Sequence, residues 1–305
     1  MENPLIALSN ELASLAERAG KDVVAVHGRP RVSSSGVVWR SGVIVTVEHA
    51  LRRGEEVRVT FPDGRASTAE LAGRDPGTDL AVLKVESTGA PALANEKQPL
   101  RPGYVALAVG RSAEAGVNAA MGVISSVAGP WHTWRGGRID QRLRLDIGLH
   151  PAASGAIVIG ASGERIGIAT PAFSRTSIFA IPAATIERVT TELLDKGHIA
   201  RGYLGVGLQP IVLPEHLRSL GPTPNNTAGG LIVLSVEKDG PAGRAGVVLG
   251  DVLVALDEKR VTDTDDVQAF LSANPIGTAV RATVLRGGAV TQFTIQIGER
   301  PRREA

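Results

Sequence analysis

A long succession of short apolar segments, separated by glycine-rich or charged turns, is the feature that most constrains the fold. The segments are rich in Val, Ile, Leu and Ala and are too short for helices, so they are typical of strands. With 36 glycines and 18 prolines, and only 3% aromatic residues, the composition also suits many strands joined by tight turns. The sequence therefore predicts a mainly β protein with barrel or sandwich architecture. The first such segments are DVVAV (22–26), GVIVT (42–46), EVRVTF (56–61), TDLAVLKV (78–85), YVALAVG (104–110) and GVISSV (122–127).

A one-sided helix is predicted ahead of these strands, over residues 4–19, with Gly20 ending it. Its leucines alternate at spacings of three and four, which places them on one face. This face packs either on the body of the protein or on another helix in an oligomer, and the sequence leaves both open. The leucines are Leu5, Leu8, Leu12 and Leu15.

A second helix is predicted over residues 183–197, where Ile186, Val189 and Leu193 share a face and Gly197 ends the helix. At 305 residues the chain is long enough for two domains. We therefore place the boundary directly after this helix.

The second unit has five further strand-like segments and a helix near residues 263–273, which Thr264 is placed to cap. We expect a helical segment over 1–20, a first domain over 21–199, a second over 200–299 and a charged tail over 300–305. The strands are YLGVGL (203–208), GLIVLSV (230–236), DVLVALD (251–257), AVRATVLR (279–286) and TQFTIQIG (291–298).

The charge and cysteine content exclude several classes of function. A formal net charge of +2 provides no basic field, so nucleic acid is not an expected partner. Without cysteine there are no disulfides or thiolate metal sites, and we expect neither metal nor cofactor. No segment approaches the roughly 18–20 apolar residues of a membrane span. The N-terminus lacks a signal-peptide pattern, so the protein is cytoplasmic or its leader was removed, and the compartment stays unknown.

Three segments carry side chains suited to nucleophilic catalysis. His49 follows one apolar strand, Asp79 begins another, and Ser154 lies in a tight turn before a third. Histidine, acid and serine occur in this order in chymotrypsin-like proteases, where different loops deliver them to one cleft. The other histidines lack the preceding strand, and Asp75 in Asp-Pro-Gly is better interpreted as a turn former.

The chain resembles the HtrA/Deg family of trypsin-like proteases through five segments in register. These are SGVIVTVEH, TDLAVLKV, the Ser154 turn, FAIP at 179–182 and RGYLGV at 201–206. The resemblance implies a chymotrypsin-like double β-barrel followed by a PDZ domain, which is a β-sandwich capped by helices. It also implies Ser154 as nucleophile, His49 as general base and Asp79 as the residue that orients His49.

The nucleophile turn departs from the family pattern. Relatives carry Gly-Asn-Ser-Gly-Gly-Pro, whereas this chain has Ala152-Ala153-Ser154-Gly155-Ala156-Ile157. The family's oxyanion hole uses the backbone N–H groups equivalent to Ala152 and Ser154, and alanine lacks glycine's access to positive φ. The resemblance thus implies an endopeptidase for unfolded or damaged proteins, with slow or switchable activity. It also implies a periplasmic or cell-envelope location, whereas a native N-terminus without a signal peptide would imply the cytoplasm. The alternatives are an inactive protease homologue acting as a holdase or adaptor, and a scaffold whose peptide groove is closed.

The family register also assigns an uncharged specificity pocket. Without a charged partner, a Lys or Arg substrate side chain would be desolvated at a cost, so we expect cleavage after small or β-branched residues. The alternative is that the residues assigned to this pocket are ordinary core residues. The assigned residues are Gly148, Leu149, Thr170, Pro171 and Ile178.

Residues 203–206 resemble the carboxylate-binding loop of HtrA-type PDZ domains. Backbone N–H groups there converge on a terminal carboxylate, and a peptide adds a strand beside the helix around 267–271. Expected partners are C-terminal peptides and unfolded polypeptides. Family members are commonly trimers, and a trimer or a monomer is expected here rather than a cage, because the loop between residues 30 and 37 is short. The residues of the expected carboxylate-binding loop are Tyr203, Leu204, Gly205 and Val206.

The segment 129–138 lies where relatives carry a sensor loop that links the PDZ side to the oxyanion hole. Trp131 and Trp134 give it two large apolar side chains in an aromatic-poor chain. The alternative is that both indoles only pack a hairpin onto the barrel.

Overall fold

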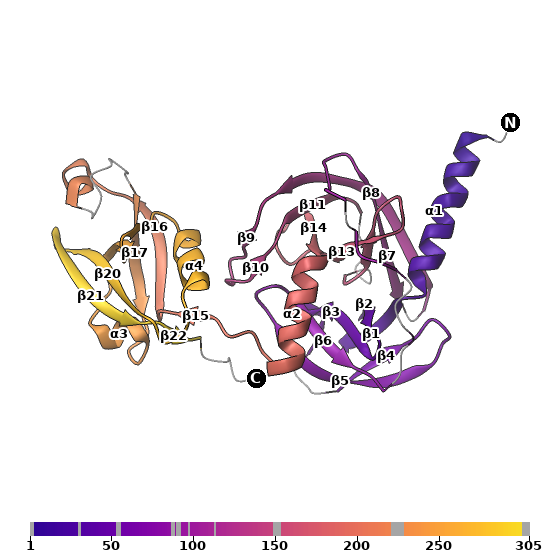
Figure 1. The fold of residues 1–305 in the computed structure, drawn as a ribbon, viewed down its shortest axis with the longest axis horizontal. Helices are drawn as coiled ribbons and strands as arrows, with labels where there is room; N and C mark the ends of the chain where they lie inside the picture. The colour runs from indigo at the N-terminus through magenta and orange to yellow at the C-terminus, as the bar shows by residue number, and fades with distance from the viewer. Residues whose placement is uncertain are drawn as a thin grey trace. The chain divides into compact units, whose positions relative to one another are not determined.

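The computed structural model describes residues 3–29, 32–52, 56–86, 89, 93–96, 98–112, 114–148, 154–220 and 229–300. The chain divides into two compact units, 1–199 and 200–305 (Figure 1). Both units are mainly β, and the first contains two closed six-stranded barrels. The predicted fold class is confirmed.

The first barrel has the strand order β1-β2-β3-β6-β5-β4, all antiparallel. Because successive side chains of a strand point to opposite faces, alternate residues place Val, Ile, Leu and Phe side chains in the core of this barrel. Its strands are β1 (Val23–Arg29), β2 (Val32–Arg40), β3 (Val43–Val47), β4 (Glu56–Thr60), β5 (Ala66–Asp75) and β6 (Leu80–Lys84).

The second barrel has the order β11-β14-β13-β12-β7-β8, and a small hairpin of β9 (Trp131–His132) and β10 (Arg138–Ile139) follows β8. The barrel strands are β7 (Val105–Ser112), β8 (Gly116–Ala128), β11 (Arg142–Asp146), β12 (Ile157–Ile159), β13 (Arg165–Thr170) and β14 (Ile178–Pro182).

Helix α2 (Ala183–Lys196) packs against strands of both barrels, and one shared apolar cluster includes residues of the two barrels and this helix. The helix buries Ile186, Val189 and Leu193 and ends at Gly197, which has a φ of 72°. The predicted helix and its glycine stop are confirmed. The shared core fixes the two barrels against each other, and the three candidate catalytic residues lie where the barrels meet.

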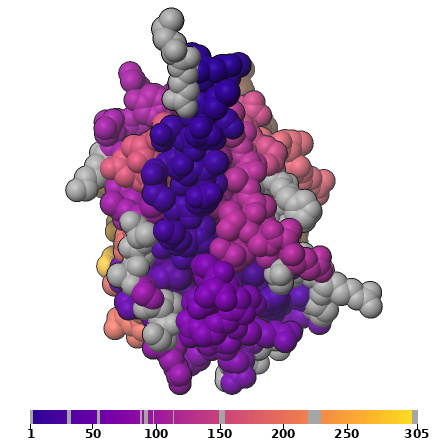
Figure 2. All heavy atoms as spheres, turned by 90° about the vertical axis from the view of Figure 1, so that its right-hand side faces the viewer, coloured from indigo at the N-terminus to yellow at the C-terminus, as the bar shows by residue number. Residues whose placement is uncertain are grey.

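Helix α1 (Pro4–Gly20) begins after the cap Asn3 and runs one residue further than expected, with Lys21 as its C-cap. Its second half packs on β1, β7 and β8, and Figure 2 shows it in indigo against this unit. Leu15 is buried there, whereas Leu5 and Leu8 are 75% and 54% exposed. Packing against this unit therefore explains the leucines in the second half of α1 but not Leu5 and Leu8.

A polar clasp connects the first barrel to α2. The indole N–H of Trp39 donates to Glu187 Oε1 at 2.8 Å, and Arg40 forms an ion pair with Glu187 Oε2 at 2.5 Å. The Arg165 guanidinium stacks over the Trp39 ring at 4.2 Å. Burial alone would raise the pKa of Glu187, but the hydrogen bonds from Arg40 and Trp39 outweigh it, and the pKa lies below its usual range.

We expect Glu187→Gln to remove part of the acid sensitivity of folding. Because the folded-state pKa is lowered, the charged carboxylate stabilises the protein above the unfolded-state pKa, and this contribution is lost as the pH falls through the folded-state value. The carboxylate is partly exposed, so about 0.5–1 kcal/mol is expected. Urea unfolding at pH 7 and pH 3 measures it, with Glu192→Gln on the same helix as control. Equal pH dependence in wild type and Glu187→Gln would contradict the assignment.

The second unit has a sheet in the order β16-β17-β18-β20-β21, with β19 paired to β18 and a separate pair of β15 and β22. Its core draws on the sheet, α3 (Pro241–Ala245) and α4 (Thr264–Ala273). The strands are β15 (Gly202–Tyr203), β16 (Val206–Val212), β17 (Gly229–Val236), β18 (Val252–Leu256), β19 (Lys259–Arg260), β20 (Ala279–Arg286), β21 (Ala289–Gln296) and β22 (Gly298–Glu299), and a 3-10 turn spans Glu215–Leu220.

One helix cap differs from the prediction. Asp263 caps α4, accepting from the N–H of Asp265, and Thr264 is the first helical residue. Asp266 completes a capping box by accepting from the N–H of Asp263. The prediction that Thr264 caps this helix is wrong because an equally good capping side chain precedes it.

Candidate active site

Strand pairing brings His49 and Asp79 together. β3 pairs with β6 so that Val47 lies opposite Leu80, which places the residues that follow β3 beside those that precede β6. A 3-10 turn at Glu48–Ala50 carries the histidine, and the N–H of Glu48 donates to the carbonyl of Asp79 at 3.0 Å. Arg29 of β1 also donates to the carbonyl of His49.

Asp79 is held by an unusual backbone conformation and by several donors. Its φ is 57°, rare outside glycine, asparagine and aspartate. The preceding turn is fixed by the buried carboxylate of Asp75, which accepts from the N–H groups of Gly77 and Thr78 and from the Thr78 hydroxyl. This confirms Asp75 as a turn former. The Asp79 carboxylate, in turn, accepts from the His49 N–H at 3.0 Å and lies 2.9 Å from His49 Nδ1 through both oxygens.

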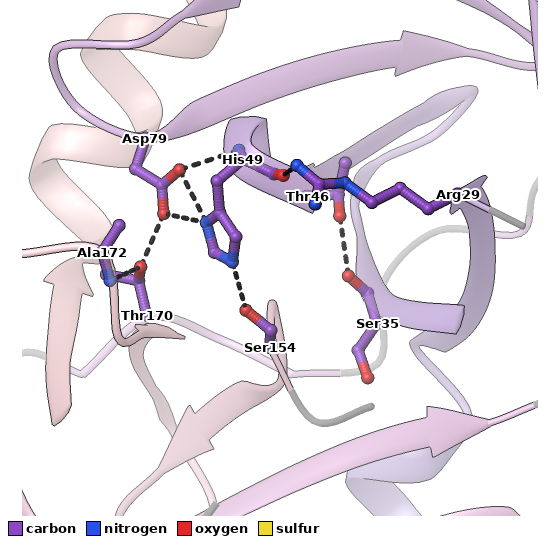
Figure 3. Close-up of polar contacts among 8 residues, drawn as sticks. All are labelled: Arg29, Ser35, Thr46, His49, Asp79, Ser154, Thr170 and Ala172. Carbon is purple, nitrogen blue, oxygen red and sulfur yellow. Dashed lines mark hydrogen bonds and ion pairs between the residues drawn. The ribbon is translucent and has the colours of Figure 1, made fainter. Parts of the chain in front are cut away.

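Ser154 completes the group from the second barrel. Its Oγ lies 2.9 Å from His49 Nε2. Figure 3 shows the Ser154 side chain directed at the His49 ring. The N–H of Ser35 on β2 donates to the Ser154 carbonyl at 2.9 Å, and the Thr46 hydroxyl donates to the Ser35 carbonyl at 2.7 Å. The first barrel thus holds the serine turn from behind.

The three predicted residues therefore form one hydrogen-bonded chain, Ser154–His49–Asp79. A carboxylate on Nδ1 favours the imidazole tautomer that carries its proton there and leaves Nε2 free to accept the serine proton. This arrangement suits nucleophilic attack by a serine hydroxyl. Among the described residues, no cluster of three His, Asp or Glu side chains is placed to hold a metal ion.

Comparison with known proteins agrees with the two units. The family model for the trypsin-like peptidase domain matches residues 34–168, and that for the PDZ domain matches residues 202–297. The chain is 30% identical to the solved HtrA-type protease AlgW with tripeptide, over 95% of this chain and 98% of that one, with a TM-score of 0.72. The chain belongs to the HtrA family.

Further HtrA relatives are similar at the same level. The serine endoprotease from Yersinia pestis is 29% identical, covers 95% of this chain and 98% of its own, and has a TM-score of 0.74. A probable periplasmic serine endoprotease, DegP-like, from Brucella suis biovar 1 (strain 1330) is 32% identical over 90% of this chain. This chain spans 54% of the length of that relative.

Thr170 has a contact that the sequence prediction did not include. Its hydroxyl is fully buried and donates to Asp79 Oδ2 at 2.5 Å, while accepting from the N–H of Ala172 at 3.0 Å. A threonine at the end of a buried strand looks like an ordinary core residue, so nothing in the sequence pattern indicates this role. The predicted contribution of Thr170 to a pocket wall stays a prediction.

We expect Thr170→Val to lower kcat about ten- to a hundredfold with little change in KM, because a hydrogen bond to a buried charge is lost without a change in shape. Thr170→Ser keeps the hydroxyl and should recover most of the activity. Steady-state kinetics on a peptide substrate measures both. If Thr170→Ser is as impaired as Thr170→Val, the hydroxyl does not position Asp79.

The described pocket candidates gather at one end of the second barrel. Ile178 begins β14, where it lies opposite Leu145 of β11, and Gly148 follows β11. Thr170 ends β13, opposite Phe179, and Pro171 follows it. Leu149 and the oxyanion candidate Ala152 lie outside the described residues. The pocket and the oxyanion hole therefore remain predictions.

The two tryptophans of the predicted sensor loop differ. Trp131 packs with the rings of Phe173 and Phe179 at centroid distances of 5.4 and 5.9 Å. Trp134 is 77% exposed, with the Arg135 guanidinium 4.6 Å from its ring. Packing onto the barrel therefore explains Trp131 alone, and the sensor role stays a prediction.

The predicted carboxylate-binding loop is braced from behind. Gly205 has a φ of 80°, its carbonyl accepts from the N–H of Glu237, and the carbonyl of Leu204 accepts from the N–H of Ala242. Within the described part of the chain, the N–H groups of Leu204 and Gly205 have no acceptor. Burial and a hydrogen bond to Glu237 raise the pKa of Tyr203 to about 12. The loop therefore presents adjacent free N–H groups, as an anion site requires.

Proposed function

We propose that this HtrA-family chain is a serine endopeptidase that cleaves unfolded or damaged polypeptides. The observation that carries the proposal is the continuous hydrogen-bonded chain from Ser154 Oγ through His49 to Asp79. No helix in the described ranges is long and apolar enough to cross a membrane.

In the proposed reaction Ser154 Oγ attacks the peptide carbonyl carbon while His49 Nε2 takes the hydroxyl proton. The negative oxygen that forms is stabilised by backbone N–H groups, for which Ser154 and Ala152 are the candidates. His49 then passes its proton to the leaving amine, and an acyl-enzyme remains. Water, deprotonated by His49, releases the acid product and restores Ser154.

We further propose small apolar specificity at the residue before the cleaved bond, from the uncharged candidates Gly148, Pro171 and Ile178. In the second unit, the free N–H groups of Leu204 and Gly205 support binding of a C-terminal carboxylate. The exposed Leu5 and Leu8 support self-association through α1, for which a homotrimer is the proposed state.

Casein degradation and fluorophosphonate labelling test the catalytic proposal, with Ser154→Ala as the matched control. We expect wild type to incorporate the probe and to cleave casein, mainly after Ala or Val. Ser154→Ala should do neither. Equal cleavage by both proteins would remove the enzyme function, and cuts mainly after Lys or Arg would remove the pocket assignment.

The second candidate function is a holdase or adaptor without proteolysis. It is favoured by Ala152-Ala153, which stand where relatives carry Gly-Asn. A chain that suppresses aggregation of unfolded casein but incorporates no fluorophosphonate would have this function.

A further inference from the structure

Strand β16 carries a proline in the middle of an exposed sheet edge. The strand is first in the sheet order, so of the described strands only β17 pairs with it in this sheet. Pro210 lies opposite Leu231 of β17, and its side chain is exposed. In sheets proline is confined to edges, because it has no N–H to donate to a neighbouring strand.

The hydrogen bonds of β17 show which way the backbone of β16 faces. Val233 uses both its backbone groups on the far side of β17: its N–H donates to the carbonyl of Asp251 at 2.8 Å, and its carbonyl accepts from the N–H of Gly250 at 2.9 Å. Leu208 lies opposite Val233. The N–H and carbonyl of Leu208 therefore point away from β17, toward the free edge.

The same orientation applies to Pro210. Backbone groups alternate along a strand, and the register from Leu208 to Pro210 runs without a bulge. Pro210 therefore faces the free edge as well. Where an N–H would point at an added strand, the proline ring stands instead, so this position offers a carbonyl but no donor.

The carboxylate-binding loop sets the register of any added peptide. A terminal carboxylate at the N–H groups of Leu204, Gly205 and Val206 places the last peptide residue beside Val206. In an antiparallel pair, the third residue from the end then lies beside Leu208 and the fifth beside Pro210. Leu208 can exchange two hydrogen bonds with the peptide, whereas Pro210 meets a peptide carbonyl with its ring.

We propose that Pro210 ends strand addition, so that the PDZ domain reads only about the last four residues of its ligands. The ligand class is thus a short C-terminal tag with a free carboxylate, and residues further upstream add nothing to the affinity. The inference rests on the proposed peptide binding by this domain.

The test compares short and long peptides on the full chain carrying Ser154→Ala, which prevents cleavage. The probes are the tightest member of a free-carboxylate tetrapeptide library and the same peptide extended upstream by Thr-Val-Thr-Val. Calorimetry should give the two peptides dissociation constants within about twofold of each other. Pro210→Ala should tighten the octapeptide about three- to tenfold, through the restored hydrogen bond, and leave the tetrapeptide unchanged.

Gln209→Ala is the matched control, because its side chain is exposed and its backbone groups face β17. It should change neither affinity. Pro210→Val should repeat the gain of Pro210→Ala in a better strand former. An octapeptide that binds wild type more than about fivefold more tightly, or no gain in either Pro210 variant, would overturn the inference while leaving peptide binding intact. If no library peptide of either length binds, the proposed peptide binding fails and the inference fails with it.

Discussion

Replacing Asp79 by asparagine is expected to lower kcat for peptide hydrolysis by about 10³–10⁴-fold while leaving the fold intact. Asparagine is among the few residues that tolerate the φ of 57° found here. Its amide oxygen can still accept from the Thr170 hydroxyl or the His49 N–H, both of which donate to Asp79. The variant should therefore fold like wild type.

The expected loss of kcat in Asp79→Asn arises from a change in the tautomer of His49. An aspartate can only accept from Nδ1, whereas the amide group of asparagine can donate to it. His49 would then carry its proton on Nε2, the nitrogen that lies 2.9 Å from Ser154 Oγ, and could not accept the serine proton. KM should change little, because Asp79 is buried behind His49.

The measurement is steady-state kinetics together with thermal unfolding. Asp75→Asn is the matched control, because Asp75 is similarly buried and fixes the same turn through hydrogen bonds from Gly77 and Thr78. It should lower the unfolding temperature but reduce kcat much less than Asp79→Asn. If Asp79→Asn retains more than about a tenth of the wild-type kcat, Asp79 does not set the tautomer.

The strands were predictable because their apolar runs are bounded by glycine and charged turns. The two candidate catalytic residues of the first barrel followed from the same pattern, since His49 and Asp79 each adjoin a strand. Their hydrogen bond required the pairing of β3 with β6, which the sequence does not state. The order of the segments along the chain therefore predicted which residues come together, but it did not predict how the strands that carry them pair.

Other features could not be predicted because two residues look alike in sequence. Trp131 and Trp134 are close in sequence and of the same type, yet among the described residues only Trp131 packs against other aromatic rings. Asp263 and Thr264 are both good caps, and the choice depends on where the helix enters the domain. In each pair, tertiary packing decides between equivalent local preferences.

Gly155, directly after Ser154, is expected to tolerate no side chain. Its φ is 85°, which costs a non-glycine residue about 1–2 kcal/mol. A Cβ there would also lie 2.2 Å from the carbonyl oxygen of Ser35, so the backbone of β2 or of the serine turn would have to move. Overpacking of this kind costs about 1–3 kcal/mol more.

We therefore expect Gly155→Ala to lower the free energy of unfolding by about 2–5 kcal/mol and the rate of fluorophosphonate labelling about 10²-fold, because small misplacements of reacting groups are costly. Gly64→Ala is the matched control: Gly64 has a φ of 83°, but a Cβ there meets no atom of the described chain within 4 Å. It should show only the conformational cost, about 1–2 kcal/mol, and wild-type labelling. Urea unfolding and labelling kinetics on both variants separate the conformational cost of the positive φ from the steric cost of the contact with Ser35. Equal losses of stability would mean that the contact with Ser35 is relieved without cost, and unchanged labelling would mean that β2 does not hold the nucleophile in place.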